Sequence, residues 1–400
     1  MKAVVWHGLG DIRLDDVPEP TLEAPSDAIV RLTASAICGT DLHFIRGTGG
    51  EMKPGTILGH EGVGVVESVG AEVHNFVPGD RVVIPSTIAC GYCPMCRRGE
   101  YSQCDNANPN GPGAGTAFYG GPAQTGPFQG LQAEKARIPF AATNLVKIPD
   151  RVTDQQAILV SDIFPTAYFG ADIAGILPGQ TVAVFGCGPV GQFVIASAKL
   201  LGAGRVFAVD RIPSRLDSAR FQGAEIINFD AEDPVEALQK LTGNLGVDVV
   251  IDAVGVDAQH ADHGPAAEKA AEEAETFQQE VAQVAPQGTA WNVGDAPSQA
   301  LEWAVQAVSK AGTVSIIGVY PQTMQAFPIG AAMNKNLKLV MGNCNHRKYI
   351  PMLLDLVQQG TLDPEKLLSQ VEEMHTAIEA YHAFDERQPG WLKVELVPGL

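Results

Sequence analysis

A glycine-rich turn in the middle of the chain restricts its possible folds more than any other feature. The segment VAVFGCGPVG (182–191) joins a predicted strand to a predicted helix, and Gly186, Gly188 and Gly191 follow the pattern G-x-G-x-x-G. In this context the first glycine makes the tight turn, the second lets a pyrophosphate approach the backbone, and the third lets helix and strand pack closely. The turn therefore predicts a dinucleotide-binding unit.

The segments after residue 180 follow one alternating pattern of strands and helices. The strand-like runs lie at 181–186, 205–210, 248–255, 312–319 and 337–341. Strands alternating with helices are typical of an α/β fold with a doubly wound parallel sheet. A helix at 350–360 and a closing strand at 391–397 follow this region.

The first 145 residues or so have a different pattern, with short β-rich runs separated by Gly, Pro and Asp clusters. These runs lie at 1–6, 28–34, 62–70 and 81–85. They predict a barrel-like β domain. A chain of 400 residues exceeds the size at which a single hydrophobic core stops growing, so we expect at least two domains.

Asp210 ends the strand RVFAVD, about 20 residues after the glycine turn. A carboxylate at this offset binds the ribose hydroxyls of NAD and repels the 2′-phosphate of NADP. Arg211 beside it is an opposing signal, because a nearby arginine accommodates that phosphate. The alternative for Asp210 is a structural role in capping the turn. Pro189, Val190 and Arg215 complete the expected cofactor-binding set.

Four crowded cysteines predict a metal site. Cys90, Cys93, Cys96 and Cys104 follow the spacing C-x2-C-x2-C-x7-C, and four thiolates this close can complete a tetrahedral zinc shell. Such a closed shell stabilises a lobe and leaves no position for a substrate. The alternatives are an iron–sulfur cluster and four unligated thiols. A total of seven cysteines, an odd number, fits a disulfide framework poorly.

Cys38 and His60 are candidate ligands of a second metal. Cys38 lies directly after an apolar strand, and His60 lies among glycines that allow the backbone to approach an ion. Each alone fits a buried core residue equally well.

Several segments together resemble the zinc-dependent medium-chain alcohol dehydrogenases. They are GHEGVGVVESVG through GDRV (59–82), the four-cysteine cluster and GCGPVG (186–191), in this order. The resemblance covers nearly the whole chain. It implies a GroES-like β-barrel catalytic domain (1–155), a Rossmann NAD-binding domain (156–342) and a C-terminal segment (343–400) that returns to the catalytic domain. It also implies one catalytic and one structural zinc per chain, NAD, and a dimer or tetramer.

The position of the last catalytic ligand in this family falls in ILVSDIFPTAYFGA (158–171), where Asp162 is the metal-binding side chain. This segment resembles the glutathione-independent formaldehyde dehydrogenases, in which Asp joins Cys and His at the zinc. Asp162 has an alternative role as a cap of the following helix. Glu61 is then an outer group or an alternative ligand.

The resemblance implies oxidation of a small alcohol or aldehyde on zinc, with hydride passing to NAD. Thr40 matches the family's relay hydroxyl, which passes the proton through the cofactor ribose to His43, although His43 is alternatively a surface histidine. Formaldehyde is the expected substrate, with dismutation if NADH stays bound, and a general alcohol or polyol dehydrogenase is the alternative. Two further hypotheses are a zinc-free NADPH reductase and a nucleotide-binding protein without catalysis.

Composition disfavours nucleic acid and membranes as partners. A net charge of −19 disfavours nucleic acid, because phosphate binding needs a basic surface. No apolar run is long enough to predict a membrane span, and the N-terminus does not resemble a secretory signal, so we expect a cytoplasmic protein.

Three segments have no assigned function. The Ala- and Glu-rich stretch 265–285 predicts a mostly solvated helix. The Gly- and Pro-rich loop 105–130 is long enough to be functional or mobile, and a comparable insertion lies over the cofactor in the formaldehyde-type enzymes. His260 and His263 are expected to be solvated loop residues.

Overall fold

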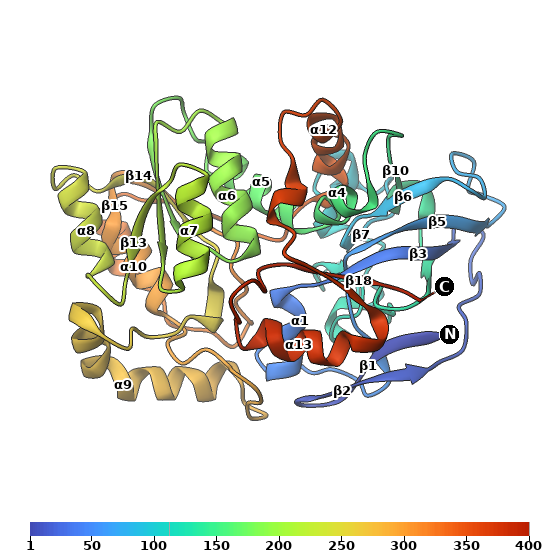
Figure 1. Cartoon of the computed structure of the whole chain (residues 1–400), viewed down its shortest axis with the longest axis horizontal. Coiled ribbons are helices and arrows are strands. Elements are labelled where there is room, and N and C mark those ends of the chain that lie inside the picture. Colours follow the sequence, from blue (N-terminus) through green and yellow to red (C-terminus); the bar gives the residue numbers. More distant parts are fainter. Residues whose placement is uncertain (112, 400) are drawn as a thin grey trace. The chain divides into compact units, whose positions relative to one another are not determined.

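The computed structural model describes residues 1–111 and 113–399, and these form two compact units. Unit 1 contains residues 1–165 and 343–400, and unit 2 contains residues 166–342. The first unit is therefore assembled from both ends of the chain, which are blue and red in Figure 1. Within the described residues, no helix is both long and apolar enough to cross a membrane.

Unit 2 contains one fully parallel six-stranded sheet in the order β13-β12-β11-β14-β15-β16. Its strands are β11 (Thr181–Phe185), β12 (Arg205–Asp210), β13 (Glu225–Asn228), β14 (Val247–Asp252), β15 (Val308–Ile316) and β16 (Lys338–Met341). Numbered within the unit, this is the order 3-2-1-4-5-6 of a Rossmann sheet. The predicted doubly wound parallel sheet is confirmed.

The helices of unit 2 connect these strands. They are α6 (Pro189–Leu200), α7 (Pro213–Phe221), α8 (Pro234–Leu241), α9 (Gly264–Val284), α10 (Gln299–Ala307) and α11 (Ile329–Asn334). The helix expected at 265–285 is thus confirmed as α9, and it buries an apolar stripe that includes Ala266, Ala270 and Phe277. The chain passes from unit 1 to unit 2 within α5 (Ile163–Ile173).

The main sheet of unit 1 has the strand order β10-β6-β5-β3-β18-β17, and β9 also pairs with β3. Its strands are β3 (Ala28–Ile37), β5 (Gly62–Val69), β6 (Arg81–Ile84), β9 (Lys135–Ile138), β10 (Val146–Lys147), β17 (Gln370–Glu373) and β18 (Val394–Val397). The closing strand predicted at 391–397 is β18, which pairs antiparallel with β3. The C-terminal segment therefore completes the sheet begun by the N-terminal segment.

Two smaller sheets and six helices complete the regular structure described in unit 1, apart from short 3₁₀ turns. One sheet pairs β2 (Asp11–Asp16), β1 (Lys2–Gly8) and β4 (Thr56–Ile57), and the other pairs β7 (Thr87–Ile88) with β8 (Ala117–Phe118). The helices are α1 (Gly39–Arg46), α2 (Pro94–Arg97), α3 (Ala141–Asn144), α4 (Asp154–Leu159), α12 (His346–Gln358) and α13 (Ala377–Asp385).

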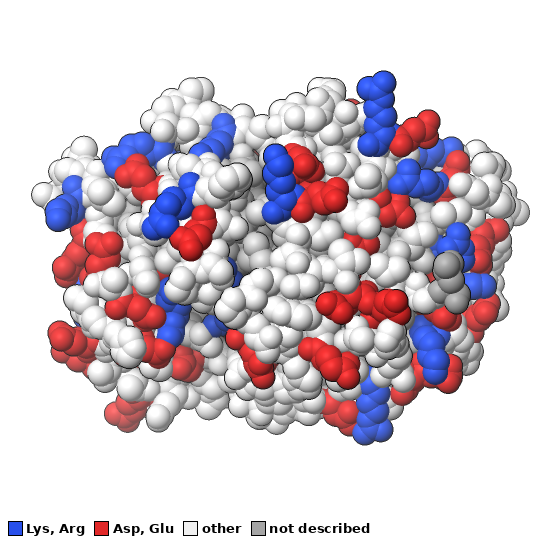
Figure 2. Space-filling model, viewed as in Figure 1, with Lys and Arg blue, Asp and Glu red and all other residues white. Residues whose placement is uncertain are grey.

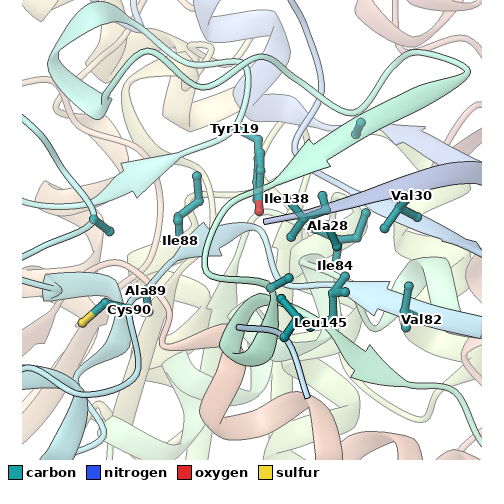
Figure 3. Close-up of a cluster of buried hydrophobic side chains, with 14 of the residues drawn as sticks. Ala28, Val30, Val82, Ile84, Ile88, Ala89, Cys90, Tyr119, Ile138 and Leu145 are labelled. Carbon is teal, nitrogen blue, oxygen red and sulfur yellow. The ribbon is translucent and has the colours of Figure 1, made fainter. Parts of the chain in front are cut away.

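The core of unit 1 runs from the main sheet toward the cysteine lobe. Figure 3 shows Val30, Ile84 and Ile138 in this cluster, with Tyr119 beside them and Cys90 at one end. All five side chains are nearly or completely buried. The cysteine lobe is therefore packed onto the same hydrophobic core that supports the sheet.

Candidate active site

Four side chains from distant parts of unit 1 converge at one buried point. Cys38, His60, Glu61 and Asp162 each present a ligand atom, and these atoms lie within 4.8 Å of one another. The Asp162 Oδ2 atom is 3.6 Å from Cys38 Sγ and 3.3 Å from His60 Nε2. One sulfur, one imidazole nitrogen and one carboxylate oxygen form a donor set that fits zinc.

Local sequence explains how these ligand atoms are held. Cys38 directly follows β3 and is the N-cap residue of α1, and its backbone N–H donates to the Asp41 carboxylate at 3.0 Å. His60 follows Gly59, whose φ of +90° favours glycine, and a Cβ on Gly59 would lie 2.4 Å from Gln132. The glycine therefore allows the close approach of two segments that brings His60 to the site.

The buried ring of His60 fits a metal ion. Neither ring nitrogen makes a well-formed hydrogen bond among the described residues, although Nδ1 lies 3.3 Å from Asp41 Oδ1. An unsatisfied imidazole that is only 1% exposed is costly unless a ligand completes it. A metal on Nε2 would leave Nδ1–H to donate to Asp41, which is the usual arrangement of a ligating histidine.

Burial disfavours the ionised forms of the ligand side chains, whereas hydrogen bonds and nearby charges favour them. Burial opposes ionisation of Asp162, but the hydrogen bond from His346 and the proximity of the His60 ring outweigh it and hold the pKa of this carboxyl well below its usual range. Burial raises the pKa of the Cys38 thiol, so a cation beside it is needed to favour the thiolate.

Glu61 lies beside a buried lysine. Its Oε1 accepts from Lys393 Nζ at 2.6 Å, while Oε2 has no partner among the described residues. Burial raises the pKa of Glu61 to about 7, and the Lys393 ammonium acts in the opposite direction. Lys393 also donates to the carbonyl of Ile37 at 3.0 Å. Glu61 is thus held by a cation of the protein at the edge of the donor set.

The two expected relay residues lie on α1. Thr40 Oγ1 is 4.0 Å from Cys38 Sγ, and His43 follows it one turn later. His43 is buried and its Nδ1 is 2.8 Å from Thr48 Oγ1. The alternative of a surface histidine is therefore wrong.

The long loop at 105–130 contributes an aromatic wall to the site, and its residue 112 lies outside the described residues. Its strand β8 pairs with β7 and places Phe118 against the His60 ring, with ring centroids 4.6 Å apart. Phe44 contacts the same Phe118 edge-on, at 6.4 Å. The loop therefore narrows the space beside the donor atoms.

The four predicted lobe cysteines also converge. The sulfur atoms of Cys90, Cys93, Cys96 and Cys104 lie within 4.8 Å of one another. Backbone amides point at them, with Cys90 N–H donating to Cys104 Sγ at 3.2 Å and Cys96 N–H to Cys93 Sγ at 3.4 Å. Burial opposes ionisation of Cys93, yet such amide donors outweigh it and lower its pKa to about 7. The geometry fits a closed tetrahedral metal shell.

The glycine turn in unit 2 has the expected local geometry. Gly186 has a φ of +84°, and a Cβ on Gly191 would lie 1.8 Å from the Gly186 carbonyl oxygen. A Cβ on Gly188 would meet only open space and the Arg215 guanidinium at 3.7 Å. Pro189 and Val190 open α6, so backbone amides and a cation border the open side of Gly188.

Asp210 has a structural role in this turn. Its Oδ2 accepts from Cys187 N–H at 2.7 Å, and its Oδ1 accepts from Arg211 and Ile212 N–H at 2.7 and 2.9 Å. A carboxylate has about four acceptor positions, so these bonds leave capacity for a ribose hydroxyl. The turn-capping alternative is thus observed, and the ribose contact stays a prediction.

Arg211 is engaged by acidic neighbours. Its Nε is 3.1 Å from Asp230 Oδ2, its guanidinium also pairs with Asp262, and Nη1 donates to the His260 carbonyl at 2.9 Å. Two carboxylates therefore compete with any phosphate for this guanidinium. His260 itself pairs with Asp295 at 2.7 Å and is about half exposed.

Sequence reasoning missed three residues at the metal site. Asp41 lies three residues after Cys38, and this spacing is that of a capping box. Lys393 is a charged residue in the mostly apolar strand WLKVELV, which is a usable signal. His346 carries no local signal, because its partner Asp162 is 184 residues away.

Comparison with known proteins identifies relatives over the whole length of the chain. Residues 24–150 match the alcohol dehydrogenase GroES-like domain, and residues 189–263 match the zinc-binding dehydrogenase family. The chain is 38% identical over 402 residues to the uncharacterized zinc-type alcohol dehydrogenase-like protein AdhB of Bacillus subtilis, covering 100% of both. It is 37% identical over 280 residues to a glutathione-independent formaldehyde dehydrogenase of Pseudomonas aeruginosa, covering 67% of this chain and 69% of that protein.

A solved structure is also similar to this chain over its whole length. The alcohol dehydrogenase TADH from Thermus sp. ATN1 superposes with a TM-score of 0.80 at 36% identity, covering 100% of both chains. The sequence and structural comparisons thus both identify dehydrogenases as the relatives of this chain.

Proposed function

The chain belongs to the zinc-dependent medium-chain alcohol dehydrogenase family, whose cofactors are zinc and NAD, and we propose that it oxidises formaldehyde at a zinc ion held by Cys38, His60 and Asp162. The observation that carries the proposal is the convergence of these three donor atoms around a buried imidazole with no well-formed hydrogen bond. Glu61, paired with Lys393, lies at the edge of this shell.

Two observations support a small aldehyde as the substrate. Asp162 lies in a segment that resembles the formaldehyde dehydrogenase subgroup, for which the resemblance implies an Asp ligand, and one such enzyme matches two thirds of the chain. Phe118 packs against the His60 ring and Phe44 packs against Phe118, so aromatic groups occupy space that a bulky substrate would need. The same aromatic wall disfavours polyols.

When bound, zinc supplies a Lewis acid that lowers the pKa of a substrate hydroxyl, and NAD supplies the hydride acceptor. The residues of the chain arrange the proton transfer. Thr40 presents a hydroxyl 4.0 Å from the Cys38 sulfur, beside the donor set. His43 is the buried base one turn further along α1, and its ring is fixed by Thr48.

Oxidation of hydrated formaldehyde gives formate, one hydride and two protons. If the reduced cofactor is retained, a second formaldehyde takes up that hydride and one of the protons, so that two formaldehyde molecules and one water give formate, methanol and one proton. Dismutation is therefore part of the proposal. The Asp210 carboxylate and the paired Arg211 both support NAD over NADP.

A general alcohol dehydrogenase is the second candidate, because the Thermus alcohol dehydrogenase is similar over the entire chain. The deciding experiment gives the purified protein NAD or NADP and compares formaldehyde, ethanol, a longer primary alcohol and a polyol without glutathione. We expect kcat/KM to be highest for formaldehyde with NAD. A higher value for the longer alcohol would favour the second candidate, and a higher value with NADP would contradict the role of Asp210.

Metal content tests the two zinc sites separately. We expect about two zinc ions per chain, one of which Asp162→Ala loses together with turnover. Cys93→Ser is the matched control, since it should lose the other zinc and lower the melting temperature. An Asp162→Ala protein with normal zinc content and turnover would refute the Cys–His–Asp shell.

We also propose a cytoplasmic location. All seven cysteines are buried and none forms a disulfide among the described residues, which is the expected state in a reducing compartment. The dimer or tetramer implied by the family resemblance stays a prediction.

A further inference from the structure

His346 holds the outer oxygen of the Asp162 carboxylate. The His346 Nε2 atom is 2.7 Å from Asp162 Oδ1, and both side chains are buried. The other carboxylate oxygen, Oδ2, is the one that faces Cys38 and His60. The two oxygens of Asp162 therefore have different neighbours, one on the side of the metal donors and one on the side of α12.

This division matters for a carboxylate ligand. A free carboxylate can turn about its terminal bond and present one or both oxygens to a metal. A hydrogen bond to one oxygen removes that freedom and leaves the other oxygen as a single ligand atom. Outer groups of this kind are worth about 10–100-fold in metal affinity or activity.

Thr87 contacts the other nitrogen of the His346 ring. Its Oγ1 is 3.1 Å from His346 Nδ1 and 3.4 Å from the Cys344 carbonyl oxygen. A carboxylate can only accept, so the 2.7 Å contact with Asp162 Oδ1 requires the ring proton on Nε2. In this tautomer Nδ1 is an acceptor, and the Thr87 hydroxyl lies within reach to donate to it.

The neighbouring Asn345 ties this arrangement to the cysteine lobe. Its Oδ1 accepts from the N–H and the hydroxyl of Ser102, both at 2.9 Å, and its Nδ2 donates to Glu100 at 2.8 Å. Ser102 lies in the short turn between Cys96 and Cys104. The first residues of α12 therefore contact the lobe through Asn345 and the Asp162 carboxylate through His346.

We propose that His346 is a positioning residue that fixes Asp162 as a one-oxygen metal ligand, and that Asn345 makes this position depend on the four-cysteine lobe. The inference rests on the proposed function, because it assumes that Asp162 binds a metal. It assigns roles to Thr87, Asn345 and His346 in holding that ligand. Because Asn345 contacts the four-cysteine lobe and His346 contacts Asp162, these neighbouring residues connect the two proposed metal sites.

Cobalt(II) substitution of the full-length holoenzyme provides the test, because the absorption of cobalt reports the geometry of its ligands. We expect His346→Ala to weaken catalytic-site metal affinity by about 10–100-fold in chelator competition, to change the cobalt spectrum, and to lower kcat more than it raises KM. His346→Gln keeps an N–H donor and should recover most of the affinity and spectrum.

His7→Ala is the matched control. His7 pairs with Asp15 at 2.7 Å, the same distance as in the His346 pair, but it joins β1 and β2 away from the donor atoms. It should leave the cobalt spectrum unchanged. A His346→Ala protein with normal metal affinity and a normal spectrum would overturn the proposal, even if its melting temperature fell.

Asn345→Ala tests the link to the lobe. We expect it to shift the cobalt spectrum of the catalytic site in the same direction as His346→Ala, and a lower melting temperature with an unchanged spectrum would overturn this part. Asp162→Ala separates the two proposals. Retention of metal by that variant sinks the proposed function, whereas loss of metal there with unaffected His346 variants sinks the positioning role alone.

Discussion

Glu395 is a buried carboxyl whose neighbours in unit 1 are themselves acidic. It lies in β18, it is 1% exposed, and its Oε2 has no hydrogen-bond partner among the described residues. Burial raises its pKa to about 7, and the charges of Asp154 and Glu365 act in the same direction. Asp154 is paired with Arg81, so its own charge is partly compensated. The folded protein therefore favours protonated Glu395.

This single residue should make stability depend on pH. The folded pKa is above the ordinary value of 4.5, so the native state binds the proton more tightly than the unfolded chain. Its contribution is complete below about pH 4.5 and is lost as pH rises through about 7. We compare the free energy of unfolding of Glu395→Gln with that of the wild type by urea unfolding. We expect this difference to shift by about 2 kcal/mol in favour of the variant when the pH is raised from about 5.5 to about 8.

The exposed Glu373 gives a control for this measurement. Glu373→Gln should change stability equally little at both pH values. An advantage of Glu395→Gln that is the same at both values would show that Glu395 titrates normally.

At the scale of the element, the turn between β11 and α6 contains two glycines with different physical constraints. Gly191 has no room for a Cβ, because that atom would lie 1.8 Å from a carbonyl oxygen. Gly188 has room and an ordinary backbone conformation, with φ −66° and ψ −172°. The fold thus needs a glycine at position 191. At Gly188 the missing side chain leaves open space that a bound pyrophosphate would occupy.

Two alanine variants should separate these roles. We expect Gly191→Ala to destabilise the protein by about 2–4 kcal/mol, because backbone must move. Gly188→Ala should melt like the wild type but bind NAD at least about tenfold more weakly, a loss of about 1.4 kcal/mol. Calorimetry with and without NAD measures both, and normal NAD affinity in Gly188→Ala would place the pyrophosphate elsewhere.

Sequence patterns predicted the elements that depend on local periodicity. Five of the six strands of unit 2 and the helix α9 were predicted at or near their observed positions, whereas the four-residue strand β13 (Glu225–Asn228) was not predicted. The two-residue strands β7 and β8 were missed, because they exist through pairing between Thr87 and Phe118, which are distant in sequence. Short strands of this kind have no pattern of their own.

The candidate site was predictable to the same extent. Cys38, His60 and Asp162 followed from motif context and resemblance, and the structure brings their donor atoms together. Lys393 is 332 residues from its partner Glu61, and no local pattern reports such a contact. Residues that hold the ligands therefore required the folded chain, whereas candidate ligands did not.

At the scale of the whole molecule, charged side chains of both signs are mixed over the face drawn in Figure 2. Figure 2 shows most Lys and Arg side chains near Asp or Glu on the face in view, without a continuous basic patch among the described residues there. Because phosphate binding needs a basic surface, the net charge of −19 disfavours nucleic acid as a partner, and this stays a prediction.

A buried ion pair joins the two segments that build unit 1. Arg46 at the end of α1 donates to Asp385 at the end of α13 through Nε at 2.8 Å and Nη2 at 2.6 Å, across 339 residues of sequence. Both side chains are 3% exposed. Removing one partner leaves the other charge buried, which is costly, whereas removing both charges is often tolerated.

We therefore expect Asp385→Asn to cost about 3–5 kcal/mol in chemical unfolding. The double variant Arg46→Met with Asp385→Leu should recover most of that loss. Arg13→Met, which breaks an exposed pair with Asp11, is expected to leave the unfolding midpoint unchanged. If the double variant is no more stable than Asp385→Asn, the loss of stability does not come from an unpaired Arg46 charge alone.

The return of the chain to unit 1 also sets the order in which a ribosome can finish the molecule. Residues 1–165 leave the ribosome long before β18, the strand that pairs with the edge of β3. All of unit 2 is translated in between, so it can fold before unit 1 has received its C-terminal segment. Because His346 and Lys393 belong to the later segment, we expect the zinc site to reach its final form only after unit 2 has been synthesised.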